Sequence, residues 1–120
     1  MAILVRETFA IYPSFSISFN ITMNIAIVGA TGNVGRKILE VLEKKKLVID
    51  NLYLLASSRS AGSKINFNSR EHEVLDLETF DFSKVKITFF AAGGKISENF
   101  AEIAAKYSLV IDNSSFYRMD

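Results

Sequence analysis

The feature that most constrains this chain is a glycine-rich turn between an apolar stretch and an amphipathic one. Residues 24–35 have the sequence Asn-Ile-Ala-Ile-Val-Gly-Ala-Thr-Gly-Asn-Val-Gly. The unbroken apolar run 25–28 is typical of a strand that is covered on both faces of a parallel sheet. Gly29, Gly32 and Gly35 lack a Cβ, so the backbone there is able to turn sharply and to approach a ligand closely. The pattern predicts a strand–turn–helix unit that cradles a pyrophosphate.

The residues after the turn favour a helix. Val34, Ile38, Val41 and Leu42 fall on one face at helical spacing. A helix that opens near Gly32 directs unpaired N–H groups and the positive end of its dipole at a bound anion. The G-x-x-G-x-x-G spacing differs from the commoner G-x-G-x-x-G, so a plain strand–turn–helix without a ligand is the alternative.

A second motif indicates which dinucleotide is bound. After a predicted strand at 52–56, an NAD site would place an acidic residue to hold the ribose hydroxyls. This chain instead has Ser57, Ser58, Arg59 and Ser60. A guanidinium fork suits a ribose 2′-phosphate, and serine hydroxyls complete the cradle, so the sequence favours NADP as the cofactor. The alternative for Arg59 is an ordinary solvated loop arginine.

Further strands and helices alternate along the chain. Apolar strands are predicted at 85–91 and 109–111, with a helix from about Ser97 between them. Phe100, Ile103, Ala104 and Tyr107 share one stripe of that helix, and we expect them in the core. Alternation of this kind predicts an α/β fold, a Rossmann-like doubly wound parallel sheet with helices on both faces, incomplete at its C-terminal end.

Ligand-binding groups of such sheets lie at the carboxyl ends of the strands. Four loops fall there and are expected to converge on one crevice: 29–35, 57–62, 91–94 (with Ala92 and Gly93) and 113–115. Two short strands, 64–67 and 71–77, joined by a turn at Asn68 and Ser69, are expected to form a small flap beside the main sheet.

Composition narrows the function classes. A chain of 120 residues that is 49% hydrophobic builds one core, and a net charge of +1 with interspersed signs predicts no nucleic-acid or membrane partner. The absence of cysteine excludes disulfides, thiolate metal sites and a cysteine nucleophile within these residues. The single histidine, His72, is expected to be a surface or edge residue, and no metal site is predicted.

Residues 1–22 differ from the rest of the chain. Phe, Ile and Ser alternate loosely there around Pro13, whereas Met23 begins the first predicted strand as a natural start would. We therefore expect residues 1–22 to be a poorly ordered extension or an upstream start, with a weak targeting segment as the alternative, and residues 23–120 to form the NAD(P)-binding domain. The chain lacks the features of an export signal, and a cytoplasmic location is expected.

Over residues 24–120 the chain resembles the aspartate-β-semialdehyde dehydrogenase family. The resemblance rests on GATGNVG, LLASSRSAG, FAAGG and IDNSSFYRMD, which occur in the family's order. It implies a cofactor-binding role for a set of residues at these motifs, with Arg59 and Ser60 at the 2′-phosphate and Arg118 at the substrate phosphoryl group or inorganic phosphate. The expected cofactor contacts are Gly29, Thr31, Gly32, Asn33, Val34, Gly35, Ser57, Arg59, Ser60, Ala92, Gly93, Asn113 and Ser114.

The resemblance also implies an activity that these residues do not complete. Family members reduce aspartyl phosphate to aspartate semialdehyde with NADPH, in the biosynthesis of lysine, threonine and methionine, through a cysteine thiolate, a histidine and an oligomeric substrate domain that would follow the DNSS segment. We expect this chain to bind cofactor without turnover. Alternatives are a non-catalytic cofactor-binding module, a decayed gene fragment, or the related N-acetyl-glutamyl-phosphate reductases; a short-chain-like reductase is disfavoured because no Tyr-x-x-x-Lys pair is present.

Overall fold

The structure, a computed structural model, describes residues 2–4 and 23–112. These residues form a seven-stranded sheet with the order β1-β7-β6-β2-β3-β5-β4. The five central strands, β7, β6, β2, β3 and β5, are parallel to one another. The outermost strands, β1 and β4, are antiparallel to their neighbours β7 and β5. The strands are β1 (Ala2–Leu4), β2 (Asn24–Val28), β3 (Asn51–Ala56), β4 (Lys64–Phe67), β5 (Arg70–Asp76), β6 (Ile87–Phe90) and β7 (Leu109–Asp112).

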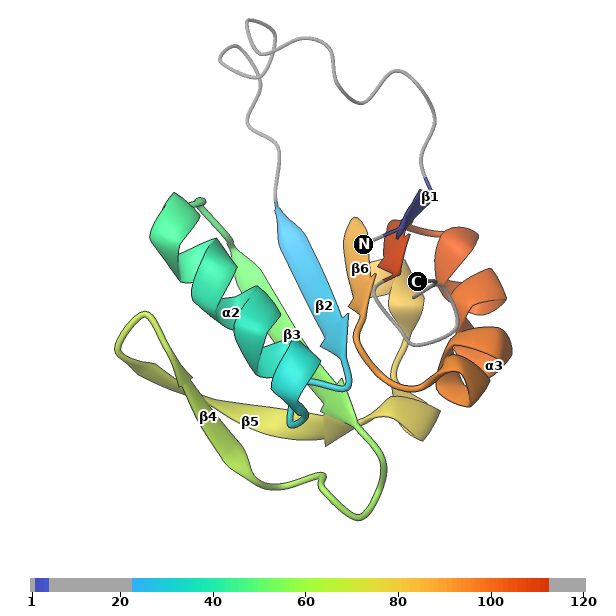
Figure 1. Cartoon of the computed structure of the whole chain (residues 1–120), viewed down its shortest axis with the longest axis horizontal. Coiled ribbons are helices and arrows are strands. Elements are labelled where there is room, and N and C mark those ends of the chain that lie inside the picture. The colour runs from blue at the N-terminus through green and yellow to red at the C-terminus, as the bar shows by residue number, and fades with distance from the viewer. Residues whose placement is uncertain (1, 5–22, 113–120) are drawn as a thin grey trace, which may run out of the picture.

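In the described part of the chain, two helices and two 3-10 turns connect the strands. Helix α2 (Asn33–Lys45) links β2 to β3, and α3 (Gly94–Ala105) links β6 to β7, so each completes a crossover between parallel strands. The short turns η2 (Leu77–Thr79) and η3 (Phe82–Lys84) join β5 to β6. Figure 1 shows α2 and α3 on either side of the sheet. None of the helices in the described part is long and apolar enough to cross a membrane.

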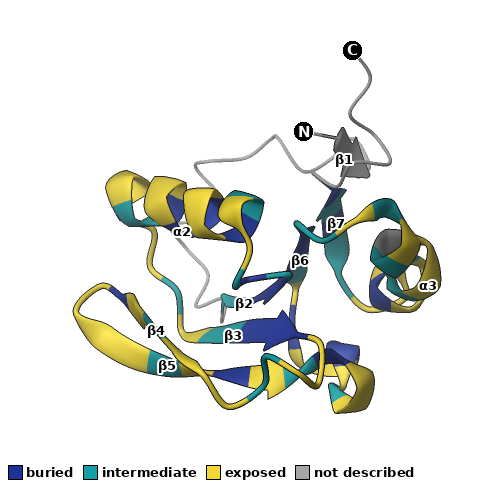
Figure 2. Cartoon of the chain, turned by 60° about the horizontal axis from the view of Figure 1, so that its bottom comes forward, coloured by how far each residue is buried: buried dark blue, intermediate teal, exposed yellow. Residues whose placement is uncertain are grey.

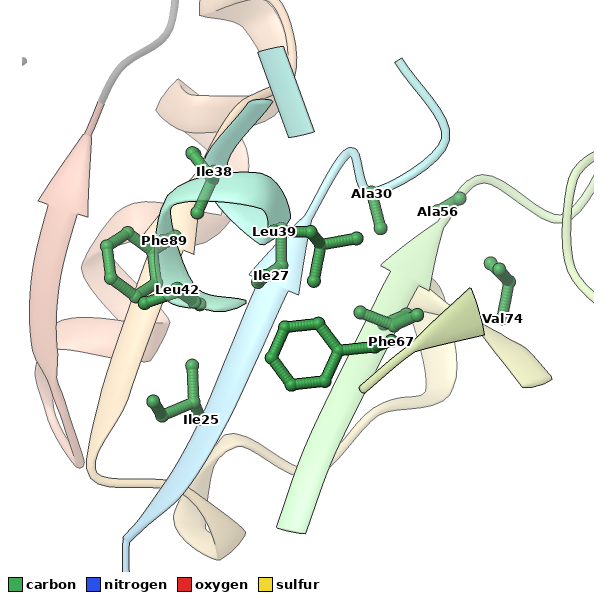
Figure 3. Packing of buried hydrophobic residues seen from close by; sticks show 11 residues of the cluster. Ile25, Ile27, Ala30, Ile38, Leu39, Leu42, Ala56, Phe67, Val74 and Phe89 are labelled. Carbon is green, nitrogen blue, oxygen red and sulfur yellow. The ribbon is translucent and has the colours of Figure 1, made fainter. Parts of the chain in front are cut away.

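Helix α2 covers one face of the sheet. Because strand side chains alternate in direction, Ile25 and Ile27 of β2 point to the same face, where they pack with Leu39 and Leu42 of α2. Phe67 of β4 reaches into the same cluster, as Figure 3 shows. The hairpin of β4 and β5 therefore belongs to the main core.

The opposite face holds a second core beneath α3 and the 3-10 turns. Ala26 and Val28, the alternate residues of β2, face this side and join Phe90 of β6 and Ala104 of α3. The two cores meet at strands β2 and β6, which are almost wholly buried. Figure 2 shows this buried centre between exposed outer helix surfaces. The predicted doubly wound sheet with helices on both faces is confirmed.

Parts of the predicted helical stripes are wrong. In α3 the buried side is formed by Ala104 with partly buried Phe100, whereas Ile103 and Tyr107 are 44% and 55% exposed. Val41 of α2 is likewise 46% exposed, and Leu39 occupies the buried position instead. These helices carry apolar side chains over an arc wider than the sheet covers, so spacing alone did not identify the buried side.

The hairpin and the first strand also differ from expectation. The β4–β5 hairpin turns at Asn68 and Ser69 as predicted, but β5 pairs in parallel with β3 and extends the main sheet, so it is not a separate flap. Residues 2–4, within the predicted extension, form β1 against β7. The other residues of that extension lie outside the described part of the chain.

Candidate functional site

Three of the four predicted ligand loops lie at one edge of the sheet. Strand β2 pairs in parallel with β3 on one side and β6 on the other, so their carboxyl ends point the same way (Figure 1). The loops that follow them are 29–35, 57–62 and 91–94. The fourth loop, with Asn113 and Ser114, and the predicted phosphate ligand Arg118 lie outside the described residues. The carboxyl edge is the expected ligand position of an open parallel sheet.

Two glycines of the first turn are required by packing. Gly29 has φ +85°, and a Cβ on it would lie 2.8 Å from the backbone nitrogen of Ala92. A Cβ on Gly35 would overlap the carbonyl oxygen of Gly29. The N–H of Gly29 donates to the carbonyl of Leu55 over 2.8 Å, which fastens the turn to β3. These glycines bring the turn, the start of α2 and the 91–94 loop together.

Gly32 is different, because nothing in the fold fills the place of its side chain. The nearest heavy atom to a Cβ there is 3.6 Å away, which is ordinary contact. Gly32 is the N-cap of α2, no side chain caps the helix, and its first turn holds no acidic residue. The N–H groups at the helix start and the positive end of its dipole therefore face open space, as anion binding requires.

Neighbouring predicted contacts surround this helix end. Thr31 is half-buried, and its carbonyl accepts a hydrogen bond from Nε of Arg36 over 3.3 Å. Asn33 is exposed, and half-buried Val34 packs against the core. The Arg36 contact holds the turn in place from the helix side. Asn33 presents its polar side chain to the surface at this helix end.

The 57–62 loop forms one helical turn at the end of β3. The N–H groups of Ser60 and Ala61 both donate to the carbonyl of Ser57, over 2.9 and 3.1 Å. Arg59 is exposed at this turn, and within the described residues its guanidinium has no carboxylate partner. A cation left without a partner beside a short helical turn matches the chemistry of a phosphate ligand.

The loop after β6 leads into α3 and has open space at Gly93. Gly93 is exposed, no side chain caps α3 there, and a Cβ on Gly93 would meet nothing within 4 Å. Ala92 is half-buried against the second core and lies beside Gly29. The starts of α2 and α3 therefore follow neighbouring strands, β2 and β6, at one edge of the sheet.

Other features of the described chain lie away from this edge. A surface groove of about 670 Å³ runs beside α2 and β4, and of the predicted contacts it includes only Asn33. His72 is half-buried, with its ring centroid 6.1 Å from that of Phe67 in an edge-to-face arrangement. Within the described residues, no group of three or more His, Asp or Glu side chains is placed to hold a metal ion.

Sequence reasoning missed one interaction at the candidate site. The Ser58 hydroxyl donates to Oδ2 of Asp76 over 3.0 Å, which joins the 57–62 loop to the end of β5. The place of Asp76 at the end of a strand was the only available signal, because the contact depends on the pairing of β3 with β5.

The glycine turn, the parallel strands and the two helix starts at their carboxyl edge together define a dinucleotide-binding α/β domain. The chain belongs to the semialdehyde dehydrogenase family: residues 24–120 match the family model described as "Semialdehyde dehydrogenase, NAD binding domain". This match confirms both the family resemblance and the nucleotide-binding class predicted from the motifs.

Individual relatives agree with the family match. Aspartate-semialdehyde dehydrogenase from Shewanella sp. (strain DB6705) is 47% identical over 98 residues, which cover 81% of this chain and 29% of the relative. The enzyme from Legionella pneumophila is 50% identical over 99 residues, covering 82% and 28%. The crystal structure of aspartate semialdehyde dehydrogenase II complexed with ASA from Vibrio cholerae has a TM-score of 0.77 at 46% identity, and the match covers 83% of this chain and 33% of that one. This chain thus spans under a third of the curated relatives' length.

Proposed function

We propose that these residues are the cofactor-binding part of an NADP-dependent aspartate-semialdehyde dehydrogenase. The observation that carries the proposal is the start of α2 at Gly32. No side chain caps the helix there, and packing within the folded chain does not require glycine at this position. The relatives' printed names support the choice of enzyme. The reaction would be the reductive dephosphorylation of aspartyl phosphate to aspartate semialdehyde.

Each loop would have a separate task in holding the cofactor. The N–H groups that follow Gly32, with Thr31, Asn33 and Val34 around them, would hold the pyrophosphate. Arg59, with Ser57 and Ser60, would bind the ribose 2′-phosphate and so set the preference for NADP over NAD. The open backbone at Ala92 and Gly93 would let the rest of the dinucleotide pass close to β6. Asn113 and Ser114 are proposed for the nicotinamide end, and Arg118 for the phosphoryl group.

Bound NADPH would supply the hydride for the reduction. The 120 residues include no cysteine, so they provide no thiolate for an acyl-enzyme. We expect the polypeptide to bind NADPH and to show no reduction of aspartyl phosphate by itself. That behaviour also fits a non-catalytic binding module, whereas a decayed fragment would bind neither nucleotide.

The test is a comparison of NADPH and NADH binding to the 120-residue chain by nucleotide fluorescence. The wild type should bind NADPH more tightly than NADH. Arg59→Ala should weaken NADPH binding by about tenfold and leave NADH unchanged, because a charge-assisted hydrogen bond contributes about 1.5–3 kcal/mol.

A matched control removes an arginine elsewhere. Arg70 is also exposed but begins β5, at the far end from the carboxyl edge. Arg70→Ala should leave both affinities as they are. A wild type that binds both nucleotides equally, or an Arg59→Ala chain that weakens both to the same extent, would contradict the NADP assignment.

A further inference from the structure

The 57–62 loop is fastened to β5 at its far end by backbone hydrogen bonds. The N–H of Gly62 donates to the carbonyl of Val74, and the N–H of Val74 donates to the carbonyl of Ser63, both over 2.8 Å. These bonds lie after Arg59 in the chain. They fix where the loop returns to the sheet and leave the orientation of its first turn to other contacts.

Among the described residues, the near end of the loop is held to β5 by one side-chain hydrogen bond. Oγ of Ser58, the residue before Arg59, donates to Oδ2 of Asp76 over 3.0 Å. Asp76 ends β5 and pairs with Ala56, the last residue of β3, so its carboxylate stands where the loop leaves the sheet. This contact connects the loop directly to the rigid part of the sheet.

The Asp76 carboxylate is itself held in place. Its Oδ1 accepts the backbone N–H of Glu78 over 3.0 Å, which caps η2, while the hydroxyl of Thr79 donates to the Asp76 carbonyl over 3.3 Å. Both carboxylate oxygens therefore have partners, and the side chain is only partly exposed. A carboxylate fixed through Oδ1 by the Glu78 N–H presents Oδ2 in a defined position to the Ser58 hydroxyl.

We propose that Asp76 is a positioning residue for cofactor preference: through Ser58 it orients the turn that carries Arg59, and so aims the guanidinium at the 2′-phosphate. This inference rests on the proposed NADP function. A carboxylate near a bound phosphate is electrostatically unfavourable. The position of the Asp76 carboxylate is explained if holding the 57–62 loop favours NADPH binding by more than the repulsion between carboxylate and 2′-phosphate opposes it.

The two effects of Asp76, holding the loop and repelling the phosphate, predict opposite changes in the ratio of NADPH to NADH affinity when its side chain is removed. If fastening dominates, Asp76→Ala and Ser58→Ala each lower the ratio of NADPH to NADH affinity, by about three- to tenfold for one net hydrogen bond. The double variant should lose no more than either single variant, because both changes remove the same contact. If the carboxylate acted only by repulsion, Asp76→Ala would raise the ratio.

The conservative variant separates the bond from the charge. Asn at position 76 keeps an acceptor for the Glu78 N–H and an amide that pairs with the Ser58 hydroxyl, but carries no charge. Asp76→Asn should keep the wild-type ratio or raise it. A ratio that falls as far as in Asp76→Ala would contradict the proposal, since the fastening bonds would then not be what matters.

Asp81 provides a matched control for lost stability. It caps η3 as Asp76 caps η2, and the hydrogen bonds from the Ser83 hydroxyl and backbone N–H lower the pKa of its carboxyl. No contact of Asp81 reaches the 57–62 loop. Asp81→Ala should affect thermal stability as Asp76→Ala does and leave the affinity ratio unchanged.

The outcomes distinguish this inference from the function on which it rests. A wild type without preference for NADPH overturns both. A wild type that prefers NADPH, with Ser58→Ala and Asp76→Ala at the same ratio, overturns the positioning role alone. Isothermal titration with 2′,5′-ADP and 5′-AMP repeats the comparison with two ligands that differ only in the 2′-phosphate. Ser58→Ala should weaken the binding of 2′,5′-ADP and leave that of 5′-AMP unchanged. If Asp76→Ala fails to fold, Ser58→Ala still decides the question.

Discussion

At the scale of single residues, the three glycines of the turn have different tasks. A methyl group on Gly32 would make only ordinary contact in the folded chain, 3.6 Å from the nearest atom, but would stand at the open helix end. Gly32→Ala should therefore weaken NADPH binding at least ~tenfold while lowering stability by about 1 kcal/mol or less, the effect of a poorer N-cap. Nucleotide fluorescence and thermal unfolding by circular dichroism measure the two effects separately.

Gly35→Ala is the opposite case. Its added Cβ would overlap the Gly29 carbonyl and press on Ala30, both backbone groups. We expect a loss of about 3 kcal/mol of unfolding free energy, since a packed backbone relaxes poorly around an inserted methyl group. If Gly32→Ala and Gly35→Ala were equally stable, or if Gly32→Ala left NADPH affinity unchanged, the proposed difference between a ligand-binding Gly32 and a packing Gly35 would be wrong.

Residue-level prediction succeeded where the signal was local. The glycine turn and the Asn68–Ser69 turn each follow from residue types a few positions apart. The role predicted for Arg59 remains a prediction. The bond between Ser58 and Asp76 joins residues 18 positions apart and exists because β3 and β5 end side by side. Sequence patterns carry no information on that pairing, so only the folded chain reveals this contact.

At the scale of elements, the hairpin turn between β4 and β5 is strained at one position. Asn68 and Ser69 have φ of 52° and 66°, and this region suits asparagine but not serine. Ser69→Gly should stabilise the chain by about 1 kcal/mol and raise its melting temperature by roughly 5 °C. Differential scanning calorimetry measures the shift.

Glycine introduced at position 71, two residues after Ser69, should lower the melting temperature instead of raising it. Glu71 lies in the exposed part of β5 with ordinary strand geometry, so Glu71→Gly should lower the melting temperature. If Ser69→Gly also lowered it, the hairpin would not adopt these backbone angles in solution.

The sequence was enough to predict which segments are strands or helices, but not which side chains of a helix are buried. Residues 64–67 were predicted as a strand and form β4, while the strand predicted at 71–77 is β5, one position earlier. Phe100 and Ala104 were correctly predicted on the buried side of α3, whereas Ile103 and Tyr107, which continue the same apolar arc, were wrongly predicted there. Which part of a wide arc is covered depends on the crossing of helix and sheet.

At the scale of the whole molecule, alternation of strands and helices was enough to predict the doubly wound sheet. It was not enough to predict β1. Residues 2–4 lie more than a hundred positions from their partners in β7, and nothing near them in the sequence marks the pairing. Contacts across such a separation depend on closing a long loop, which local patterns do not reveal.

The exposed apolar side chains at the end of α3 give a prediction for the molecule as a whole. Ile103 is 44% exposed and Tyr107, in the turn after the helix, 55%. Exposed apolar groups close together favour association, so the chain should self-associate as its concentration rises, and Ile103→Glu with Tyr107→Glu should shift sedimentation velocity profiles toward the monomer. Val41→Glu with Val48→Glu is the control pair, because it adds the same charge at other exposed apolar positions, 46% and 82% exposed on and after α2. A wild type that stays monomeric at every concentration, or a control pair that dissociates it equally well, would show that this end of α3 is not the surface through which the chain associates.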